Sequence, residues 1–230
     1  ADAGTVIYFY GNDADGQRFW LISNVVQEVL ENGKQVSFVM YESTGGTHAS
    51  PVASARGLSV WGDLTITFAD CTSGTAVLSG IDGAKHSSIL KIVGVSGTNC
   101  VGQPSSDGPM SGVWFDLAYD GEGFNLIVTP IGVVVYYYGF DQQGNRLWLI
   151  SDVIGSTLQA GQQLVSDMFK ASSGSFAAPV PSDQALEKWG TVTINVVDCG
   201  NMTITTNTQE GLKVSNTIRI VSVAGLTCVD

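Results

Sequence analysis

An internal repeat constrains the fold of this chain more than any other feature. Trp20–Ser23 (WLIS) recurs 128 positions later as Trp148–Ser151, and Trp61–Gly62 recurs at the same offset as Trp189–Gly190. The alignment continues without a gap to a Cys-Val dipeptide near the end of each copy. A period this long indicates a duplicated domain rather than the short unit of a solenoid.

The duplication predicts two β modules, one in residues 1–105 and one in residues 106–230. The second copy begins near Ser111, so the first copy lacks a counterpart of Ser111–Val128. Either two leading strands are missing, or the module is used in permuted form. Missing strands would leave an open sheet edge that needs cover from elsewhere.

Short alternating segments separated by turn residues predict an all-β fold. The 28 glycines and the 44% of hydrophobic residues are typical of β proteins that bury a core. Eight strands are expected in the second copy, at residues 111–116, 124–129, 133–140, 146–151, 163–170, 190–197, 202–207 and 217–223. Eight sequential strands favour two tandem antiparallel meander β-barrels, because closure removes sheet edges. Two β-sandwich modules are the alternative.

Side-chain alternation predicts which strand faces are buried. Val192, Ile194 and Val196 alternate with polar residues, as in a strand with one buried face. Segment 133–140 is apolar on both faces, so we expect it to be covered twice, by the other module or by a partner. The last strand of each copy is predicted to have Ile218 and Ile220, or Leu90 and Ile92, inward, with Arg219 or Lys91 outward.

The four cysteines recur as two pairs of equal separation, Cys71 with Cys100 and Cys199 with Cys228. In a meander, the strands that precede the two cysteines of a pair run parallel, so both cysteines lie at one rim. We expect one disulfide in each module, contributing about 3–4 kcal/mol on the loop-entropy model. Metal binding is the alternative, but no C-x-x-C spacing occurs, so no metal site is predicted. Disulfides indicate a secreted or cell-surface protein, the periplasm included.

Charge and the lack of a recurring catalytic set exclude several functions. The net charge of −11 argues against nucleic acid or an anionic membrane as a partner. No uninterrupted apolar run of about 18 residues occurs, so no transmembrane helix is predicted. His48 and His86 align with Phe176 and Val214, so a catalytic histidine would exist in one copy only. We predict no enzyme, no catalytic residues and no cofactor.

Two acidic motifs are interpreted as structural. Segment Gly11–Gly16 resembles a calcium loop in composition, but a hairpin turn explains its glycines and those of its counterpart, Gly139–Gly144. Asp70 and Asp198 both precede a cysteine, and we expect each carboxylate to fix a turn.

Aromatic residues are the candidate ligand-binding groups. Tyrosine and tryptophan combine a flat apolar face with one polar group, which suits sugars and small ring ligands. The alternative is that these side chains pack within the β core and between the two modules. The candidates are Tyr8, Tyr10, Trp20, Trp114, Tyr136, Tyr138 and Trp148.

The segments SGVWFDLAYDGEGFNLIV, YYYGFDQQGNRLWLIS and WGTVTINVVDC resemble a tandem module of secreted proteins from Gram-negative bacteria. That module has a Ser-Gly-x-Trp-Tyr/Phe-Asp opening with a later Gly-x-Gly-Phe, a Tyr-rich strand ending in Asp-x-x-Gly, and a cysteine pair. The resemblance covers nearly the whole chain and implies an extracellular bacterial setting, with no catalytic residues. Gly112–Trp114 and Phe124–Leu126 are also similar to the first hairpin of avidin-like and lipocalin barrels, without any biotin-binding residue.

Three functions are consistent with these features. The first is an extracellular, non-enzymatic β protein that binds a glycan or small molecule through its aromatic side chains. The second is a structural surface protein that assembles into a homo-oligomer or filament, completed by strand exchange. The third is an inhibitor of a secreted hydrolase, in which loops such as Thr44–Ser54 enter the partner's cleft.

Overall fold

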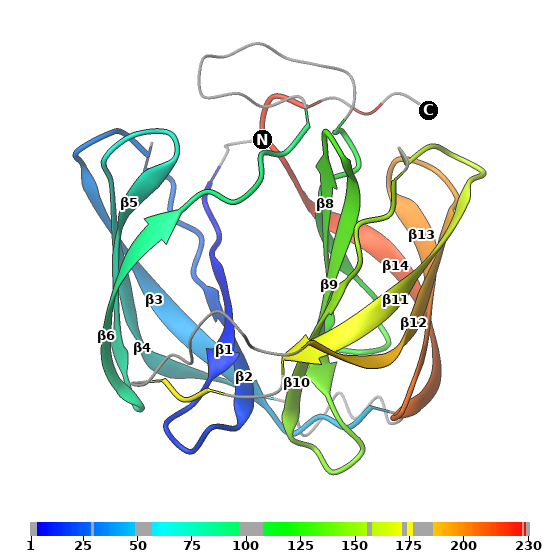
Figure 1. Cartoon of the computed structure of the whole chain (residues 1–230), viewed down its shortest axis with the longest axis horizontal. Helices are drawn as coiled ribbons and strands as arrows, with labels where there is room; N and C mark the ends of the chain where they lie inside the picture. Colours follow the sequence, from blue (N-terminus) through cyan, green and yellow to red (C-terminus); the bar gives the residue numbers. More distant parts are fainter. Residues whose placement is uncertain are drawn as a thin grey trace. The chain divides into compact units, whose positions relative to one another are not determined.

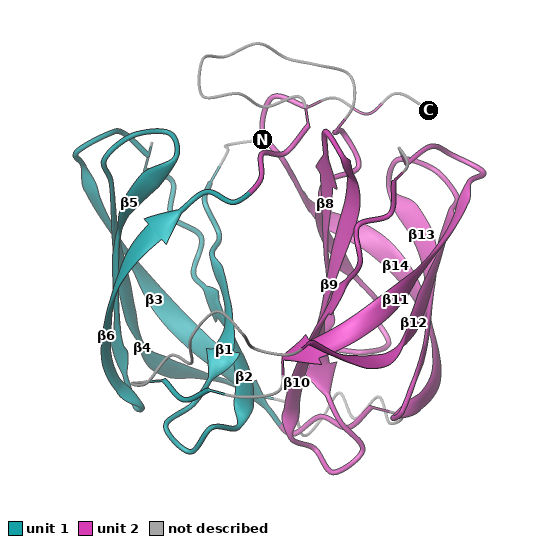
Figure 2. Ribbon diagram, in the orientation of Figure 1, with its two compact units in different colours: residues 1–44, 57–92, 173–184 teal, residues 45–56, 93–172, 185–230 magenta. Residues whose placement is uncertain are grey.

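A computed structural model describes residues 4–28, 30–48, 57–96, 108–155, 158–171, 174–176, 186–226 and 228. These residues form fourteen β-strands, as the all-β prediction requires (Figure 1). None of the described residues belongs to a helix with the length and hydrophobicity needed to cross a bilayer. The chain divides into two compact units (Figure 2). Unit 1 comprises residues 1–44, 57–92 and 173–184, and unit 2 comprises residues 45–56, 93–172 and 185–230.

Unit 1 contains an antiparallel sheet of six strands that follow one another in sequence order. The strands are β1 (Tyr8–Asn12), β2 (Arg18–Ser23), β3 (Gln35–Thr44), β4 (Gly57–Phe68), β5 (Ser73–Gly80) and β6 (Gly83–Leu90). Among the described residues, β1 and β6 are the two outer strands and do not pair with each other. The first copy therefore forms a half-barrel sheet rather than the expected closed barrel. In the described ranges, this sheet has an outer strand at the position where the barrel of the second copy has its leading hairpin.

Unit 2 contains a closed antiparallel barrel of eight strands, which confirms the barrel prediction for the second copy and excludes the sandwich there. The strands are β7 (Gly112–Phe115), β8 (Gly123–Thr129), β9 (Gly132–Phe140), β10 (Arg146–Ser151), β11 (Gln163–Ala171), β12 (Leu186–Val196), β13 (Asn201–Thr208) and β14 (Gly211–Ser222). The β7–β8 hairpin lies between β14 and β9 and closes the barrel. Strands β12 and β14 begin earlier than predicted.

Each unit has its own apolar core, built from the inward side chains of its strands. In the barrel, Val192, Ile194 and Val196 are buried as their alternation predicts. In unit 1, Leu64 and Ile66 are buried and Phe68 packs against the same core.

The prediction for the last strand of each copy is wrong for the residues expected inside and for Arg219, whereas Lys91 is exposed as expected. The residues expected inside are exposed: Ile218 and Ile220 by 37% and 52%, and Leu90 and Ile92 by 75% and 91%. Arg219, expected outside, is half-buried: its guanidinium lies 5.7 Å from the ring centroid of Trp114 and donates to the carbonyl oxygen of Pro109.

The inner face of β14 is polar because its polar groups find partners inside the barrel. Lys213 pairs with Glu122, and the hydroxyl of Thr217 donates to the carbonyl oxygen of Met202 at 3.0 Å. Buried polar groups that are hydrogen-bonded carry little penalty, so the strand does not need an apolar inner face.

The Trp-Gly motif of each copy places a glycine where two strands approach closely. A Cβ atom on Gly62 would lie 2.1 Å from the carbonyl oxygen of Ser79, and one on Gly190 would lie 2.3 Å from that of Asn207. On the other side of the strand, the register with β3 shifts beside Gly62 and the register with β11 shifts beside Gly190. A β-bulge therefore lies next to the glycine at the same place in both copies.

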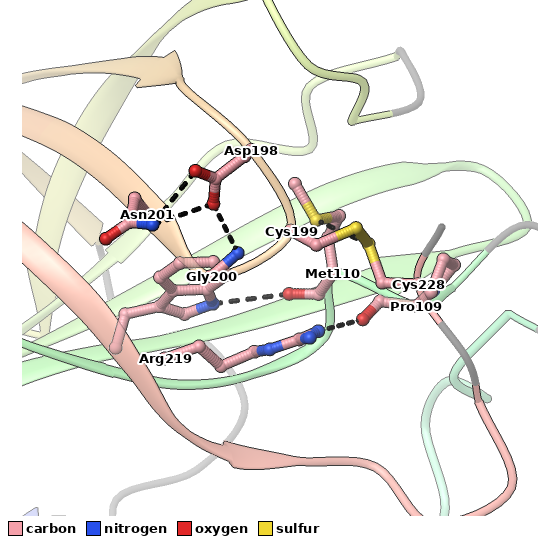
Figure 3. The surroundings of a disulfide bond; sticks show 9 residues. Pro109, Met110, Asp198, Cys199, Gly200, Asn201, Arg219 and Cys228 are labelled. Carbon is pink, nitrogen blue, oxygen red and sulfur yellow. Dashed lines mark hydrogen bonds between the residues drawn. A yellow bond between two sulfur atoms is a disulfide. The ribbon is translucent and has the colours of Figure 1, made fainter. Parts of the chain in front are cut away.

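The disulfide between Cys199 and Cys228 is confirmed, and it ties the turn after β12 to the segment that follows β14 (Figure 3). The Cys228 sulfur also lies 3.4 Å from the Met110 sulfur. The expected Cys71–Cys100 pair cannot be placed in the same way, because Cys100 lies outside the described residues.

The aspartates beside these cysteines fix turns, as predicted. The Asp198 carboxylate accepts hydrogen bonds from the Gly200 backbone N–H at 2.7 Å and from the Asn201 side chain at 2.9 Å (Figure 3). The Asp70 carboxylate accepts hydrogen bonds from the backbone N–H and the hydroxyl of Thr72, and from the hydroxyl and the backbone N–H of Ser73, and these bonds lower its pKa to about 2. Hydrogen bonds to the charged form lower the pKa of Asp198 as well.

The two units exchange equivalent segments of the duplicated chain. Residues 45–56 of the first copy belong to unit 2, and the matching residues 173–184 of the second copy belong to unit 1. The contacts repeat: the backbone N–H of His48 donates to the Asp141 carbonyl at 3.1 Å, and that of Phe176 donates to the Asp13 carbonyl at 2.9 Å. Both aspartates sit in the hairpin turns that the sequence predicted. Each unit therefore contains residues of both copies.

Candidate functional site: an open sheet edge

The barrel of unit 2 shows how this module holds its leading hairpin, β7–β8. Trp114 of β7 is fully buried in the barrel core, and its indole N–H donates to the carbonyl oxygen of Met110 at 3.2 Å. Asp116, at the end of β7, accepts a hydrogen bond from the backbone N–H of Asn216 on β14 at 2.8 Å. The hairpin is thus anchored both by an aromatic side chain and by a carboxylate that binds the edge of β14.

A second carboxylate of the hairpin lies deep inside the barrel. Glu122, just before β8, forms an ion pair with Lys213 of β14, and the two side chains are only 2% and 3% exposed. The other carboxylate oxygen of Glu122 accepts a hydrogen bond from the Tyr137 hydroxyl at 2.8 Å. The Lys213 ammonium also lies 3.9 Å from the ring centroid of Tyr119. These contacts supply the partners that a buried charge pair needs.

The edge strand β6 of unit 1 presents matching positions without that hairpin. Lys85, Ser88 and Lys91 occupy the places of Lys213, Asn216 and Arg219. Lys85 is half-buried, and its ammonium lies 6.0 Å from the ring centroid of Phe9 and 5.8 Å from that of Phe176. Within the described part of the chain, no carboxylate forms an ion pair with Lys85.

His48 completes the buried polar cluster of the barrel. Its ring is 2% exposed, lies edge-on to Tyr137 with 6.5 Å between centroids, and has no hydrogen-bond partner for either nitrogen among the described residues. Burial lowers the pKa of His48, and the nearby Lys213 lowers it further, while Glu122 and Glu210 oppose this shift. The surroundings of His48 therefore disfavour its charged form.

We expect His48→Phe to flatten the pH dependence of barrel stability between pH 7 and pH 5. A histidine with a lowered pKa binds its proton more readily in the unfolded chain, so it stabilises the fold above its unfolded pKa and loses this contribution on acidification. Phenylalanine is the residue that unit 1 uses at the matching position, Phe176. Denaturant unfolding at several pH values measures the effect, whose slope for one proton is at most about 1.4 kcal/mol per pH unit. Parallel curves for the two proteins would contradict the prediction.

The predicted aromatic residues form one similar outer face in each unit, apart from Trp114. In unit 1, Tyr10 pairs across the sheet with Trp20, and the Tyr8 and Tyr10 rings stack with 6.3 Å between centroids. In unit 2, Tyr138 pairs across the sheet with Trp148.

These aromatic residues differ in their access to solvent. Tyr8, Tyr10, Tyr136 and Trp148 are half-buried, whereas Trp20, Trp114 and Tyr138 are buried. Burial also raises the pKa of Tyr136. A role in ligand binding stays a prediction. Tyr8, Tyr10, Tyr136 and Trp148 suit it better than the three buried residues, because part of each side chain is accessible to solvent. Of the loop Thr44–Ser54, proposed to enter a hydrolase cleft, the residues after His48 lie outside the described part of the chain.

No family model, curated protein or solved structure matches this chain. Sequence reasoning did not single out Glu122, Lys213 or Lys85. The available signal was a lysine that recurs at one position of both copies and is followed two positions later by a serine, Ser87 or Ser215, on the same face of the strand.

Proposed function

We propose that this protein is a secreted, non-enzymatic assembly module whose first unit accepts an added β-hairpin beside β6. The observation that carries the proposal is the comparison of the two units. Strands β1–β6 repeat the strands that the β7–β8 hairpin closes into a barrel in unit 2. An outer strand with free main-chain groups is a template for strand addition.

The backbone direction of β6 fits this role. In unit 2, the N–H of Asn216 points out of β14 toward the hairpin and binds Asp116. The N–H of Lys91 in unit 1 points the other way and donates to the Thr72 carbonyl at 2.7 Å. Because N–H directions alternate along an antiparallel strand, the N–H of Ser88, the counterpart of Asn216, points toward an added strand.

A labelled synthetic peptide of residues 111–129 tests the proposal. We expect saturable binding to the full chain at one site, measured by fluorescence anisotropy. Ser88→Pro removes the outward N–H and should weaken binding about fivefold or more, while an edge strand tolerates proline. Ser88→Ala keeps the N–H and is the matched control, with unchanged binding. No saturable binding, or equal binding by the two variants, would exclude the site.

Ligand binding by the aromatic faces is a second candidate function, favoured by the recurrence of one aromatic face in both units. We expect Tyr10→Ala and Trp148→Ala to reduce binding to any glycan that the wild-type protein retains on an array. Unchanged binding by both variants would rule this role out.

A further inference from the structure

We propose that the partner of unit 1 is an acidic β-hairpin whose second strand is preceded by a carboxylate that pairs with Lys85. This inference rests on the proposed function, since it names the chemistry of the added hairpin. It assigns to Lys85 the role of selecting the partner.

The Lys85 ammonium differs in its surroundings from its counterpart in unit 2. In unit 2, the equivalent Lys213 is almost fully enclosed, and the Glu122 carboxylate of the hairpin neutralises it. Lys85 points toward the core of unit 1 but is only half-buried, with the rings of Phe9 and Phe176 on its apolar side. A hairpin added beside β6 would bury this ammonium, which is costly without a paired carboxylate.

An inward-pointing charge on an edge strand discourages pairing with strands that carry no matching group. A neutral hairpin would leave Lys85 buried and unpaired, whereas one with a glutamate at the position of Glu122 would not. Lys85 therefore both protects the edge and distinguishes the correct partner. Selectivity of this kind arises from a penalty on the wrong partner as well as from a contact with the correct one.

The remaining matched positions agree with this chemistry. Ser88 takes the place of Asn216, whose N–H binds Asp116. Lys91 takes the place of Arg219, whose guanidinium lies 5.7 Å from the ring centroid of Trp114. The fitting hairpin thus carries an aromatic residue in its first strand, an aspartate at the end of that strand, and a glutamate before the second.

A charge-swap binding experiment on the full chain tests the inference. The probes are the 111–129 peptide and its Glu122→Gln and Glu122→Leu variants, titrated against the wild-type chain and against Lys85→Met. On the wild-type chain, we expect the Gln peptide to bind about thirtyfold more weakly or worse. On Lys85→Met, the Leu peptide should bind better than the Glu peptide, because the carboxylate would then be buried without a partner.

Lys34→Met is the matched control, since it removes one positive charge from unit 1 at an exposed pair with Glu28. Its affinity for the Glu peptide should equal that of the wild-type chain. Equal binding of the Glu and Gln peptides to the wild-type chain would overturn the role of Lys85 while the acceptor function stands. Failure of every peptide to bind would overturn both proposals.

Discussion

Glu122→Ala is expected to lower the free energy of unfolding of the barrel by about 3–5 kcal/mol, because it leaves the Lys213 ammonium buried without a countercharge. The side chains of the pair are almost fully enclosed, and the Tyr137 hydroxyl loses its acceptor in the same variant. Denaturant unfolding, followed by hydrogen exchange of the β7–β14 amides, measures this loss in unit 2.

Two further variants separate the buried charge from other causes. Asp167→Ala breaks the exposed ion pair with Lys188 in the same barrel and should cost no more than about 1 kcal/mol. Glu122→Leu combined with Lys213→Met removes both charges and should recover most of the lost stability. If Glu122→Ala and Asp167→Ala cost the same, or the double variant is no better than Glu122→Ala, this account of the cluster is wrong.

The repeat allowed most of the fold to be predicted from the sequence. The strand Arg146–Ser151 was placed at its observed bounds, and the open edge followed from the missing counterpart of the leading hairpin. These features depend on the local alternation of polar and apolar residues and on the alignment of the sequence with itself at an offset of 128 positions. Both can be determined without knowledge of distant contacts.

The orientation of the last strand and the buried cluster could not be found in the same way. The partner of Lys213 is Glu122, 91 residues away and in the turn of another hairpin. Without that partner, a lysine is most simply placed outside, and the apolar Ile218 and Ile220 inside. A polar face of a strand can point into the core only when residues elsewhere in the fold supply partners for its polar groups.

The exchange of segments between the two copies could not be predicted from the sequence either. The two segments align without a gap, and each meets the same kind of hairpin turn through the carbonyl of Asp13 or Asp141. Alignment alone does not say which copy each segment packs against. Each segment buries one ring, Phe176 in unit 1 and His48 in unit 2. Substitution of these two residues therefore tests the exchange directly.

Phe176→Ala is expected to destabilise unit 1 by about 3–5 kcal/mol, although residue 176 belongs to the second copy of the repeat. The Phe176 side chain is 1% exposed and meets two aromatic rings of the unit 1 core edge-on, with 5.4 Å between centroids to Trp61 and 6.3 Å to Phe19. Its removal leaves a cavity among rings that cannot collapse easily. Hydrogen exchange should show lost protection in β1–β6.

The location of this loss decides whether the segments are exchanged. If each copy kept its own segment, Phe176→Ala would destabilise the barrel and leave β1–β6 protected. The matched variant is His48→Ala, which removes the equivalent side chain from unit 2 and should reduce protection in β7–β14 alone. Opposite responses to equivalent substitutions follow only from a chain in which each copy supplies a buried side chain to the other unit. Each unit then needs a residue of both copies for its core, so neither copy of the repeat can complete a core by itself.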